Sequence, residues 1–155
     1  MIEHLLDHGL GLLHVLMALA SLCFGSLVIF WRKGDKTHRW LGRSYLAAMS
    51  GLNLTALSNF ELFGRFGPFH WLALISLASI MAGFLAVRRK GPHWKHAHAW
   101  FMTGSYVGLL AATAAEIASR VPGWSFGAAV AISSGLVIFL GLVSMSRILP
   151  GRIRS

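Results

Sequence analysis

Residues 14–45, HVLMALASLCFGSLVIFWRKGDKTHRWLGRSY, decide the fold of this chain. A long apolar run begins at His14 and ends at a basic hinge, Arg32-Lys33-Gly34. A second apolar segment begins a few residues later, at His38. Two long apolar segments joined by a short polar hinge predict a helical hairpin, and Gly34 is suited to the turn between the two helices.

The same order of features returns in residues 70–106, HWLALISLASIMAGFLAVRRKGPHWKHAHAWFMTGSY. His70 opens the apolar run, Arg88-Arg89-Lys90-Gly91 forms the hinge, and His98 lies at the start of the next apolar segment. In both copies the opening histidine precedes the first arginine of the hinge by 18 positions. The repetition predicts two copies of one hairpin, with four histidines at matching positions.

The composition indicates that these segments lie in a membrane. Of the 155 residues, 55% are hydrophobic and only 12% are charged, whereas a soluble domain carries about a quarter charged residues. The mean hydropathy is +0.64, and the apolar residues form long runs rather than one-sided patterns. We therefore predict an all-α integral membrane protein.

Five segments are long enough to cross a hydrocarbon core of ~30 Å at ~1.5 Å per residue. They cover about residues 9–31, 38–60, 69–87, 96–118 and 126–146. We expect five transmembrane helices in one membrane domain, residues 1–155, that consists of repeat 1 (about 9–63), repeat 2 (about 68–119) and a fifth helix (about 126–147). A short loop precedes Pro68, which is well placed to start the third helix, and residues 147–155 are expected to form a short basic tail.

The net charge of +9 comes from 14 Lys and Arg against five acids. The basic residues gather in the two hinges and at the C-terminus, which the positive-inside rule places on the cytoplasmic side. This predicts that the N-terminus lies outside and the C-terminus inside. Because the rule accounts for the positive charge, nucleic acid is not an expected partner.

The four matched histidines are candidate functional residues, because an ionisable group inside a bilayer is costly unless it is paired. His14 and His70 are expected at corresponding depths near the outer face, and His38 and His98 near the inner face. Two imidazoles that face one another supply the two axial ligands of a b-type haem. The sequence thus predicts two haems b, the first with iron ligands His14 and His70 and the second with His38 and His98. The chain has no Cys-x-x-Cys-His, so neither haem would be covalently attached.

Other residues leave alternatives open. His96 is an alternative to His98, because the two point to nearly opposite sides of a helix and only one can face the bundle. Tyr45 and Tyr106 are equivalent in the repeat and could hydrogen-bond a cofactor or only pack. A divalent metal held by the same histidines, or no cofactor at all, is the alternative to haem.

The fifth segment stands outside the repeat and carries Gly127, Ala131 and Gly135 at a spacing of four. Small residues at this spacing let membrane helices approach closely. We expect these residues to pack the fifth helix against the bundle, or else to contact a second copy of the chain or a larger complex. In the fourth segment Glu116 is followed one turn later by Arg120, which favours an ion pair.

Two motifs resemble the signatures of a family of uncharacterised bacterial membrane proteins. Residues 38–45, HRWLGRSY, match the pattern His-Arg-x-x-Gly-Arg-x-Tyr. Residues 98–106, HAWFMTGSY, resemble His-x-x-Trp-Met-x-x-Ser-Tyr but depart from it in the His-to-Trp spacing and in an inserted Gly104. The layout of the histidines is also similar to the cytochrome b561 superfamily, in which helix pairs hold one haem near each membrane face. That similarity implies His14 with His70 as outer ligands and His38 with His98 as inner ligands.

We therefore expect a small di-haem b-type cytochrome that carries electrons across the membrane, with haems between the first and third helices and between the second and fourth. Its partners besides lipid would be a quinol, a redox protein or a larger membrane complex, and no residue is assigned a catalytic role. Two alternatives stay open. One is a non-redox accessory subunit of a larger complex, and the other is a carrier that binds a metal or small molecule through the same histidines.

Overall fold

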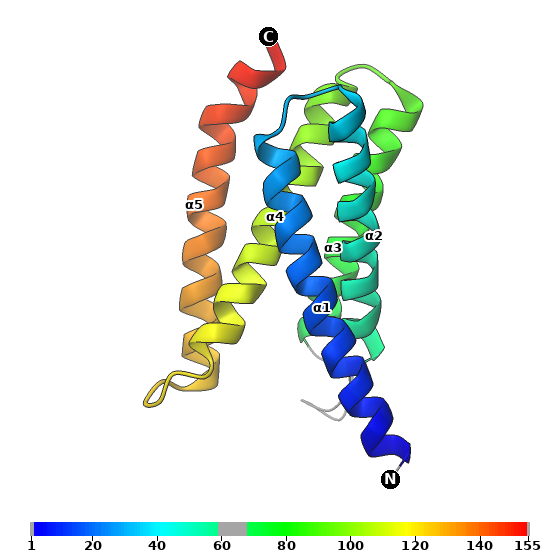
Figure 1. Ribbon diagram of the computed structural model, residues 1–155. Helices are drawn as coiled ribbons and strands as arrows, with labels where there is room; N and C mark the ends of the chain where they lie inside the picture. Colours follow the sequence, from blue (N-terminus) through cyan, green and yellow to red (C-terminus); the bar gives the residue numbers. More distant parts are fainter. Residues whose placement is uncertain (1, 59–67, 155) are drawn as a thin grey trace. The chain divides into compact units, whose positions relative to one another are not determined.

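The computed structural model describes residues 2–58 and 68–154, without the side chains of residues 2–8, 68 and 150–154. It contains five α-helices: α1 (Ile2–Phe30), α2 (Lys36–Ser58), α3 (Pro68–Arg89), α4 (Trp94–Ala118) and α5 (Phe126–Arg154) (Figure 1). None of the described residues lies in a β-strand. The prediction of an all-α protein built from five helices is confirmed.

The helix bounds agree with the expected segments except at the two ends of the chain. α3 begins at Pro68, as predicted, while the expected loop before it falls on residues outside the described part. α1 begins at Ile2, well before the expected start at residue 9. The expectation of a separate basic tail after the fifth helix is wrong, because this basic segment is helical and α5 continues through Pro150 to Arg154. Proline is tolerated inside membrane helices where neighbouring groups satisfy the backbone that it leaves unbonded.

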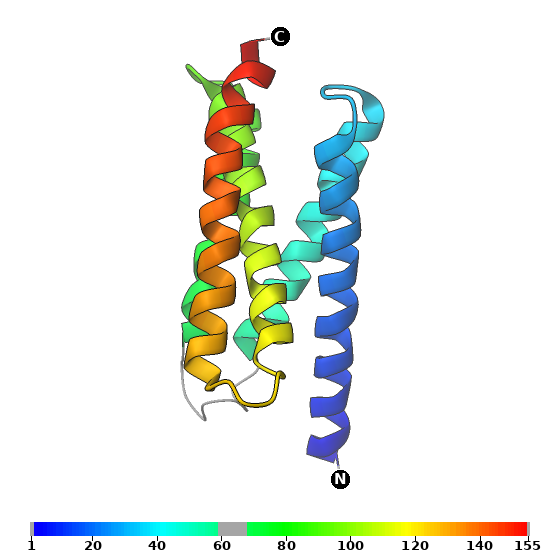
Figure 2. The same cartoon turned by 90° about the vertical axis from the view of Figure 1, so that its left-hand side faces the viewer.

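The chain forms two compact units, residues 1–78 and 79–155, and the boundary between them falls within α3. In the first unit α1 packs along α2, and in the second α4 packs along α5 (Figure 1, Figure 2). Each pair is antiparallel, because a short connection joins its two helices. Each unit thus contains one helical hairpin together with part of α3.

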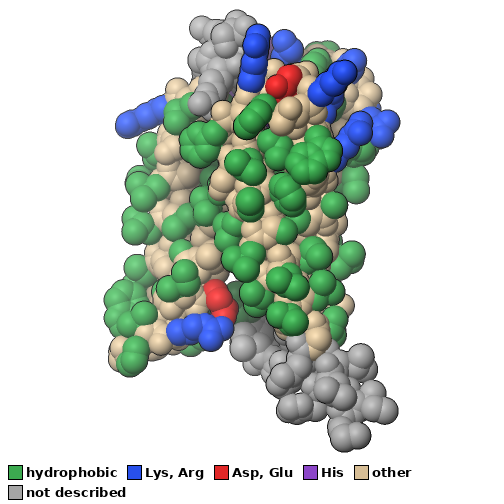
Figure 3. All heavy atoms as spheres, viewed as in Figure 1, with side chains coloured by type: hydrophobic (Ala, Val, Ile, Leu, Met, Phe, Trp, Pro, Cys, Tyr) green, Lys and Arg blue, Asp and Glu red, His purple; other side chains and the backbone are tan. Residues whose placement is uncertain are grey.

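Four of the helices are long and apolar enough to cross a membrane, with spans at Gly9–Phe30, Phe69–Arg89, Trp94–Ala118 and Phe126–Leu149. Hydrophobic side chains cover much of the visible helix surface, while Lys and Arg side chains lie towards the helix ends (Figure 3). These features identify a multi-pass membrane protein. Among the described helices α2 is the exception, because it carries three basic residues in its first part and several polar ones later.

Small residues bring α1 close to α2 in the first unit. A Cβ atom on Gly51 would lie only 2.9 Å from Sδ of Met17, so the glycine leaves the space that this side chain fills. Nearer the hinge, the rings of Phe24 and Trp40 meet edge to face, with centroids 5.9 Å apart and an interplanar angle of 86°. The hairpin is therefore held by close packing along most of its length.

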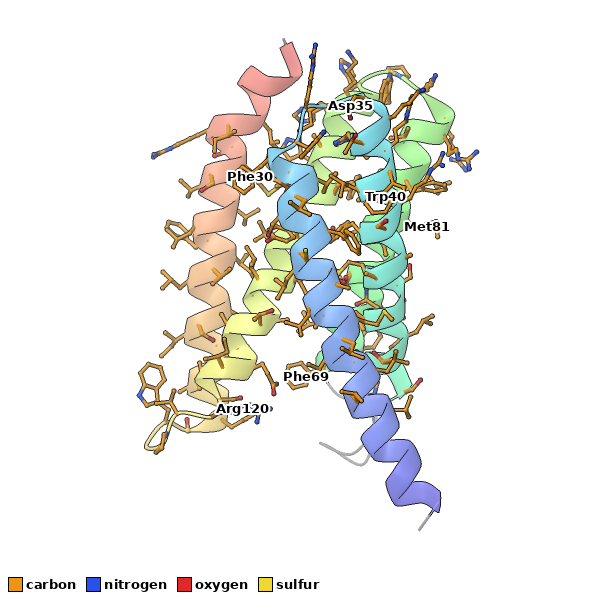
Figure 4. The ribbon with its side chains drawn as sticks, in the orientation of Figure 1. Phe30, Asp35, Trp40, Phe69, Met81 and Arg120 are labelled. Carbon is orange, nitrogen blue, oxygen red and sulfur yellow. The ribbon has the colours of Figure 1, made fainter. Side chains whose placement is uncertain are left out.

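The first hinge is fixed by its own polar residues. Asp35, which Figure 4 shows at the turn between α1 and α2, accepts a hydrogen bond of 2.6 Å from the backbone N–H of His38 and so acts as the N-cap of α2. Nζ of Lys33 donates to two carbonyl oxygens in the last turn of α1, at 2.8 and 2.7 Å. Gly34 has a φ of 86°, which confirms its predicted role in the turn.

Two other glycines hold α5 against α4 in the second unit. Gly141 of α5 faces Val107 of α4 so closely that a Cβ atom on the glycine would collide with both methyl groups of the valine. A Cβ atom on Gly104 of α4 would lie 3.8 Å from Cε of Met145 of α5, an ordinary packing distance. Close approach at Gly141 therefore sets the distance between these two helices.

Candidate functional site

His14 lies half-buried on α1, and its ring contacts α2. Its Nδ1 atom is 3.0 Å from Oγ1 of Thr55. The Thr55 hydroxyl is buried and donates its own proton to the backbone carbonyl of Leu52, at 2.8 Å. Since a hydroxyl has a single proton, Thr55 acts as the acceptor towards His14, and the proton between them belongs to Nδ1.

This hydrogen bond assigns the tautomer of a neutral His14. An imidazole that is protonated on Nδ1 carries its lone pair on Nε2. The two nitrogens lie on opposite sides of the ring, so Nε2 is directed away from Thr55. Metal-ligating histidines commonly show the same arrangement, with the other ring N–H donated to an oxygen. The ring of His14 is therefore oriented as that of an Nε2 ligand would be.

His98 of α4 has the same arrangement in the second unit. It is half-buried, and its Nδ1 atom is 2.9 Å from the backbone carbonyl oxygen of Gly83 on α3. A carbonyl oxygen can only accept, so Nδ1 carries the proton, and in the neutral ring Nε2 carries the lone pair. His96 is exposed instead, with its ring 5.8 Å from that of Trp100. Of the two alternatives, His98 is the one that faces a neighbouring helix within its unit.

A glycine makes the contact at His98 possible. A Cβ atom on Gly83 would lie 2.8 Å from Sδ and 2.9 Å from Cγ of Met102, and 3.3 Å from Cβ of Phe101. Both residues are on α4, the helix that carries His98. Glycine therefore allows α4 to approach α3 until the imidazole reaches the carbonyl oxygen. Gly51 and Met17 make an equivalent close contact beside His14.

The other two matched histidines lie near helix starts, as expected. His70 is 3% exposed and sits in the first turns of α3, next to Phe69 (Figure 4), within the same unit as His14. His38 is half-buried in the first turn of α2, where Asp35 bonds its backbone N–H. The pairing of His14 with His70 and of His38 with His98 stays a prediction.

Further polar residues are buried in the first unit. Nδ2 of Asn53 donates to the backbone carbonyl of Met49 at 2.8 Å and to Oγ of Ser76 on α3 at 3.0 Å. Ser21 of α1 is fully buried, and within the described part of the chain its hydroxyl has no hydrogen-bond partner. Tyr45 is also buried, whereas its repeat equivalent Tyr106 is half-buried. A membrane protein places such groups inside only where something compensates their desolvation.

The described residues contain no group of three or more His, Cys, Asp and Glu side chains placed to hold a metal ion. The four matched histidines lie on four different helices, α1 to α4. Glu116 and Arg120 form the ion pair that the sequence favoured, and both side chains are largely exposed at the end of α4.

The small residues of α5 face outward. Cβ atoms placed on Gly127 and Gly135 would have no atom within 4 Å, and Ala131 is exposed. The contact of α5 with α4 depends on Gly141 instead. In the described residues, this stripe of small side chains is therefore not the surface by which α5 packs in its own unit.

Sequence reasoning missed Thr55 and Gly83 as partners of the histidines, although the hinges give a signal. His14 precedes Gly34 by 20 positions, and Thr55 follows Asp35 by 20. Gly83 precedes Lys90 by seven positions, and His98 follows Gly91 by seven. Residues about equally distant from the hinge lie at similar depths in an antiparallel hairpin, so counting outward from each hinge places both partners near the histidines.

The comparisons with known proteins agree with a membrane location. A family model described as predicted membrane protein (DUF2306) matches residues 11–150. Neither the curated proteins nor the solved structures include a match to the chain. The match covers most of the sequence, and the chain therefore belongs to the family of predicted membrane proteins that this model describes.

Proposed function

We propose that this member of the DUF2306 family is a small di-haem b-type cytochrome that carries electrons across the membrane. The observation that carries the proposal is the shared orientation of His14 and His98. Each donates its Nδ1–H to an oxygen of a neighbouring helix, at 3.0 and 2.9 Å, so that the lone pair of the neutral ring lies on Nε2. A purely structural polar contact does not require the same tautomer twice, whereas an Nε2 ligand does.

The residues present fit a haem with two histidine ligands. Imidazole is a common axial ligand of b-type haem, and the ligand nitrogen must be deprotonated, as Nε2 of His14 and His98 would be in their neutral rings. Small side chains on the His14 face of α1, Ala18, Ser21 and Gly25, would allow a flat group to approach the helix. The fully buried Ser21 hydroxyl adds a polar atom on that face for which the described residues offer no partner.

The proposed ligand sets follow the sequence repeat. His14 and His70, both in the first unit, would bind one haem, and His70 is buried as an intramembrane ligand should be. The second set, His38 and His98, rests on the sequence repeat alone, because His38 belongs to the first unit and His98 to the second. Tyr45 and Tyr106 are proposed as neighbours of the two sites.

A haem with two histidine ligands, when bound, takes up and releases single electrons. The protein would contribute the orientation of the imidazoles and an apolar surrounding that excludes water. Basic side chains at the first hinge and at the start of α2, such as Arg32 and Arg39, are exposed and would pair with the propionate groups of a haem at the membrane surface. The proposed setting is a bacterial inner membrane that all five helices cross, N-terminus outside and C-terminus inside. A quinol or a redox protein would exchange electrons with it.

Reduced-minus-oxidised visible spectra of the detergent-purified protein test this function. With haem supplied during expression, we expect a b-type spectrum in the wild type and loss of about half the haem in His14→Ala/His70→Ala. His98→Ala should lose the other half, and the exposed His96→Ala serves as the matched control that keeps both. A wild-type protein without any b-type band would overturn the proposal. Retention of all haem in both histidine variants would overturn the ligand assignment.

A second candidate function is that of a non-redox accessory subunit. The outward orientation of Gly127, Ala131 and Gly135 favours it, because helices in lipid associate through such residues. It predicts a colourless protein that co-purifies with a partner or a second copy, and Gly135→Leu should abolish that association. Metal analysis of the same preparation would identify the remaining candidate, a carrier that binds a metal through the histidines.

A further inference from the structure

We infer that the Thr55 hydroxyl and the Gly83 carbonyl are positioning groups, which fix the Nδ1–H tautomers of His14 and His98 and thereby tune two metal ligands separately. The tautomer assignment stands on hydrogen bonds within each unit. Its consequence for a bound haem rests on the proposed function. The two acceptors differ in kind, since that of His14 is the Thr55 side chain and that of His98 is the Gly83 backbone.

Thr55 is itself held in position. It is 7% exposed, and its hydroxyl proton is committed to the carbonyl of Leu52 one turn earlier on α2. Its lone pairs are consequently directed outward from the helix, where Nδ1 of His14 donates to them. The result is a chain of two hydrogen bonds, from the imidazole to the hydroxyl and from the hydroxyl to the backbone. Such chains polarise one another in a medium of low dielectric constant.

Gly83 acts through the absence of a side chain. Its carbonyl oxygen lies on a helix, where it also accepts the ordinary backbone bond of that helix, so the imidazole needs close access to the second lone pair. A Cβ atom at this position would lie 2.8 Å from Sδ of Met102 and would push α4 away. The bond from His98, 2.9 Å long, depends on that access.

The difference has a functional consequence. Donation of the Nδ1–H to an oxygen makes the opposite nitrogen a stronger ligand, which stabilises the oxidised state of a bound iron. A side-chain substitution at position 55 can remove the acceptor for His14, whereas no side-chain substitution removes the carbonyl for His98. The His14 ligand can therefore be adjusted by replacing its acceptor side chain, whereas the His98 ligand responds only to changes in the packing of α4 against α3.

The first test reads the tautomers directly and requires no haem. Nitrogen NMR of ¹⁵N-histidine-labelled protein in detergent, with signals assigned by His14→Gln and His98→Gln, should show both wild-type rings protonated at Nδ1. Thr55→Val, which keeps the shape and removes the acceptor, should shift His14 towards protonation at Nε2 and leave His98 unchanged. Thr55→Ser is the matched control and should retain the wild-type tautomer. A wild-type His14 protonated at Nε2, or a Thr55→Val spectrum identical to wild type, would overturn the inference.

The second test separates this inference from the proposed function. In a redox titration of the haem-loaded protein, Thr55→Val should raise the midpoint potential of one haem only and weaken haem retention at that site by about tenfold. Gly83→Ala should affect the other haem, and Met102→Ala added to it should restore much of the wild-type behaviour by making room. A wild type that binds no haem would refute the proposed function and leave the tautomer result standing. Bound haem with an unchanged potential in Thr55→Val would refute the tuning alone.

Discussion

A histidine inside a membrane must satisfy two ring nitrogens where no water is available. For His14 and His98 the structure shows how one of them is satisfied, through an oxygen on the adjacent helix. Moving a polar group from water into an apolar medium without a hydrogen-bond partner costs on the order of several kcal/mol. The hydrogen bond at Nδ1 thus does two things at once: it offsets part of the cost of burial, and it fixes which nitrogen of the neutral ring carries the lone pair.

Asn53 shows the structural use of a buried polar side chain. Its amide donates to Met49 of its own helix and to Ser76 of α3, so Asn53→Ala should remove the link from α2 to α3 and leave the Ser76 hydroxyl without its donor. We expect a loss of about 0.5–2 kcal/mol of stability, measured as a lower thermal unfolding midpoint in detergent. Leu54→Ala, at the exposed neighbouring position, is the control and should change the midpoint less. Equal midpoints for the two variants would contradict this role.

At the residue scale, the sequence pointed to candidate functional residues but not to the orientation of their side chains. The four histidines, the hinge glycine and Pro68 at the start of a helix were all identifiable, because spacing and turn chemistry are local properties. The partner of His14 is 41 positions away, and that contact depends on the register of the hairpin. The choice between His96 and His98 likewise depended on helix rotation, which two positions of sequence cannot determine.

Among the helices, α2 departs most from the average membrane segment. It is not among the four described apolar spans, yet its residues Leu41, Tyr45, Ala48, Met49, Leu52, Asn53 and Thr55 are buried. Two of its polar side chains, Asn53 and Thr55, are buried and hydrogen-bonded, so they lower the hydropathy without contacting lipid. Its basic side chains Lys36, Arg39 and Arg43, which lower the hydropathy further, are exposed near the start of the helix. Hydropathy alone therefore understates how well such a helix suits the interior of a membrane bundle.

Gly135 and Gly141 of α5 should respond in opposite ways to the same substitution. Gly141→Ala would force a methyl group into Val107 and should destabilise the protein by about 1–3 kcal/mol. Gly135→Ala meets no atom within 4 Å and should be neutral or stabilising by up to about 1 kcal/mol, since alanine favours the helix. Thermal unfolding in detergent measures both. If Gly135→Ala were the more harmful change, the outward placement of that face would be wrong.

Helix bounds were predictable to within a few residues where hydropathy and charge change together, as at both hinges. They were not predictable at the C-terminus, where arginines and a proline suggested a tail but the helix continues to Arg154. Long arginine side chains allow a helix to extend beyond the hydrocarbon core, because their charged ends remain in water or among headgroups. Charge therefore marks the depth of a residue better than it marks the end of a helix.

At the scale of the whole molecule, both units use one construction: a hairpin or adjacent helix pair in which a histidine reaches an oxygen equally far from the hinge. Family membership establishes the membrane location and nothing about the chemistry. The proposed function consequently stands on the four matched histidines and on the ring orientation of His14 and His98. The fold class followed from composition, while the function depends on contacts that only the packed helices reveal.

The number of membrane crossings can be decided from the faces on which the two hinges lie. If α2 and α3 both cross, the hinges share a face; if α2 does not cross, they lie on opposite faces. In a Cys23→Ala background, which removes the single native cysteine, Thr37→Cys and Pro92→Cys report on the hinges and Ser125→Cys on the loop before α5. With a membrane-impermeant maleimide, Ser125→Cys should react in intact spheroplasts, whereas the two hinge cysteines should react only after lysis, as the positive-inside rule requires.

The opposite result would be equally informative. Reaction of Pro92→Cys but not Thr37→Cys in intact spheroplasts would show that α2 stays on one side, and the proposed five crossings would be wrong. It would also separate the histidines of the two repeats, because matched positions would then lie at unequal depths. A pair of equivalent haem sites requires equal depth for each ligand pair, so the face of the second hinge bears directly on the proposed function.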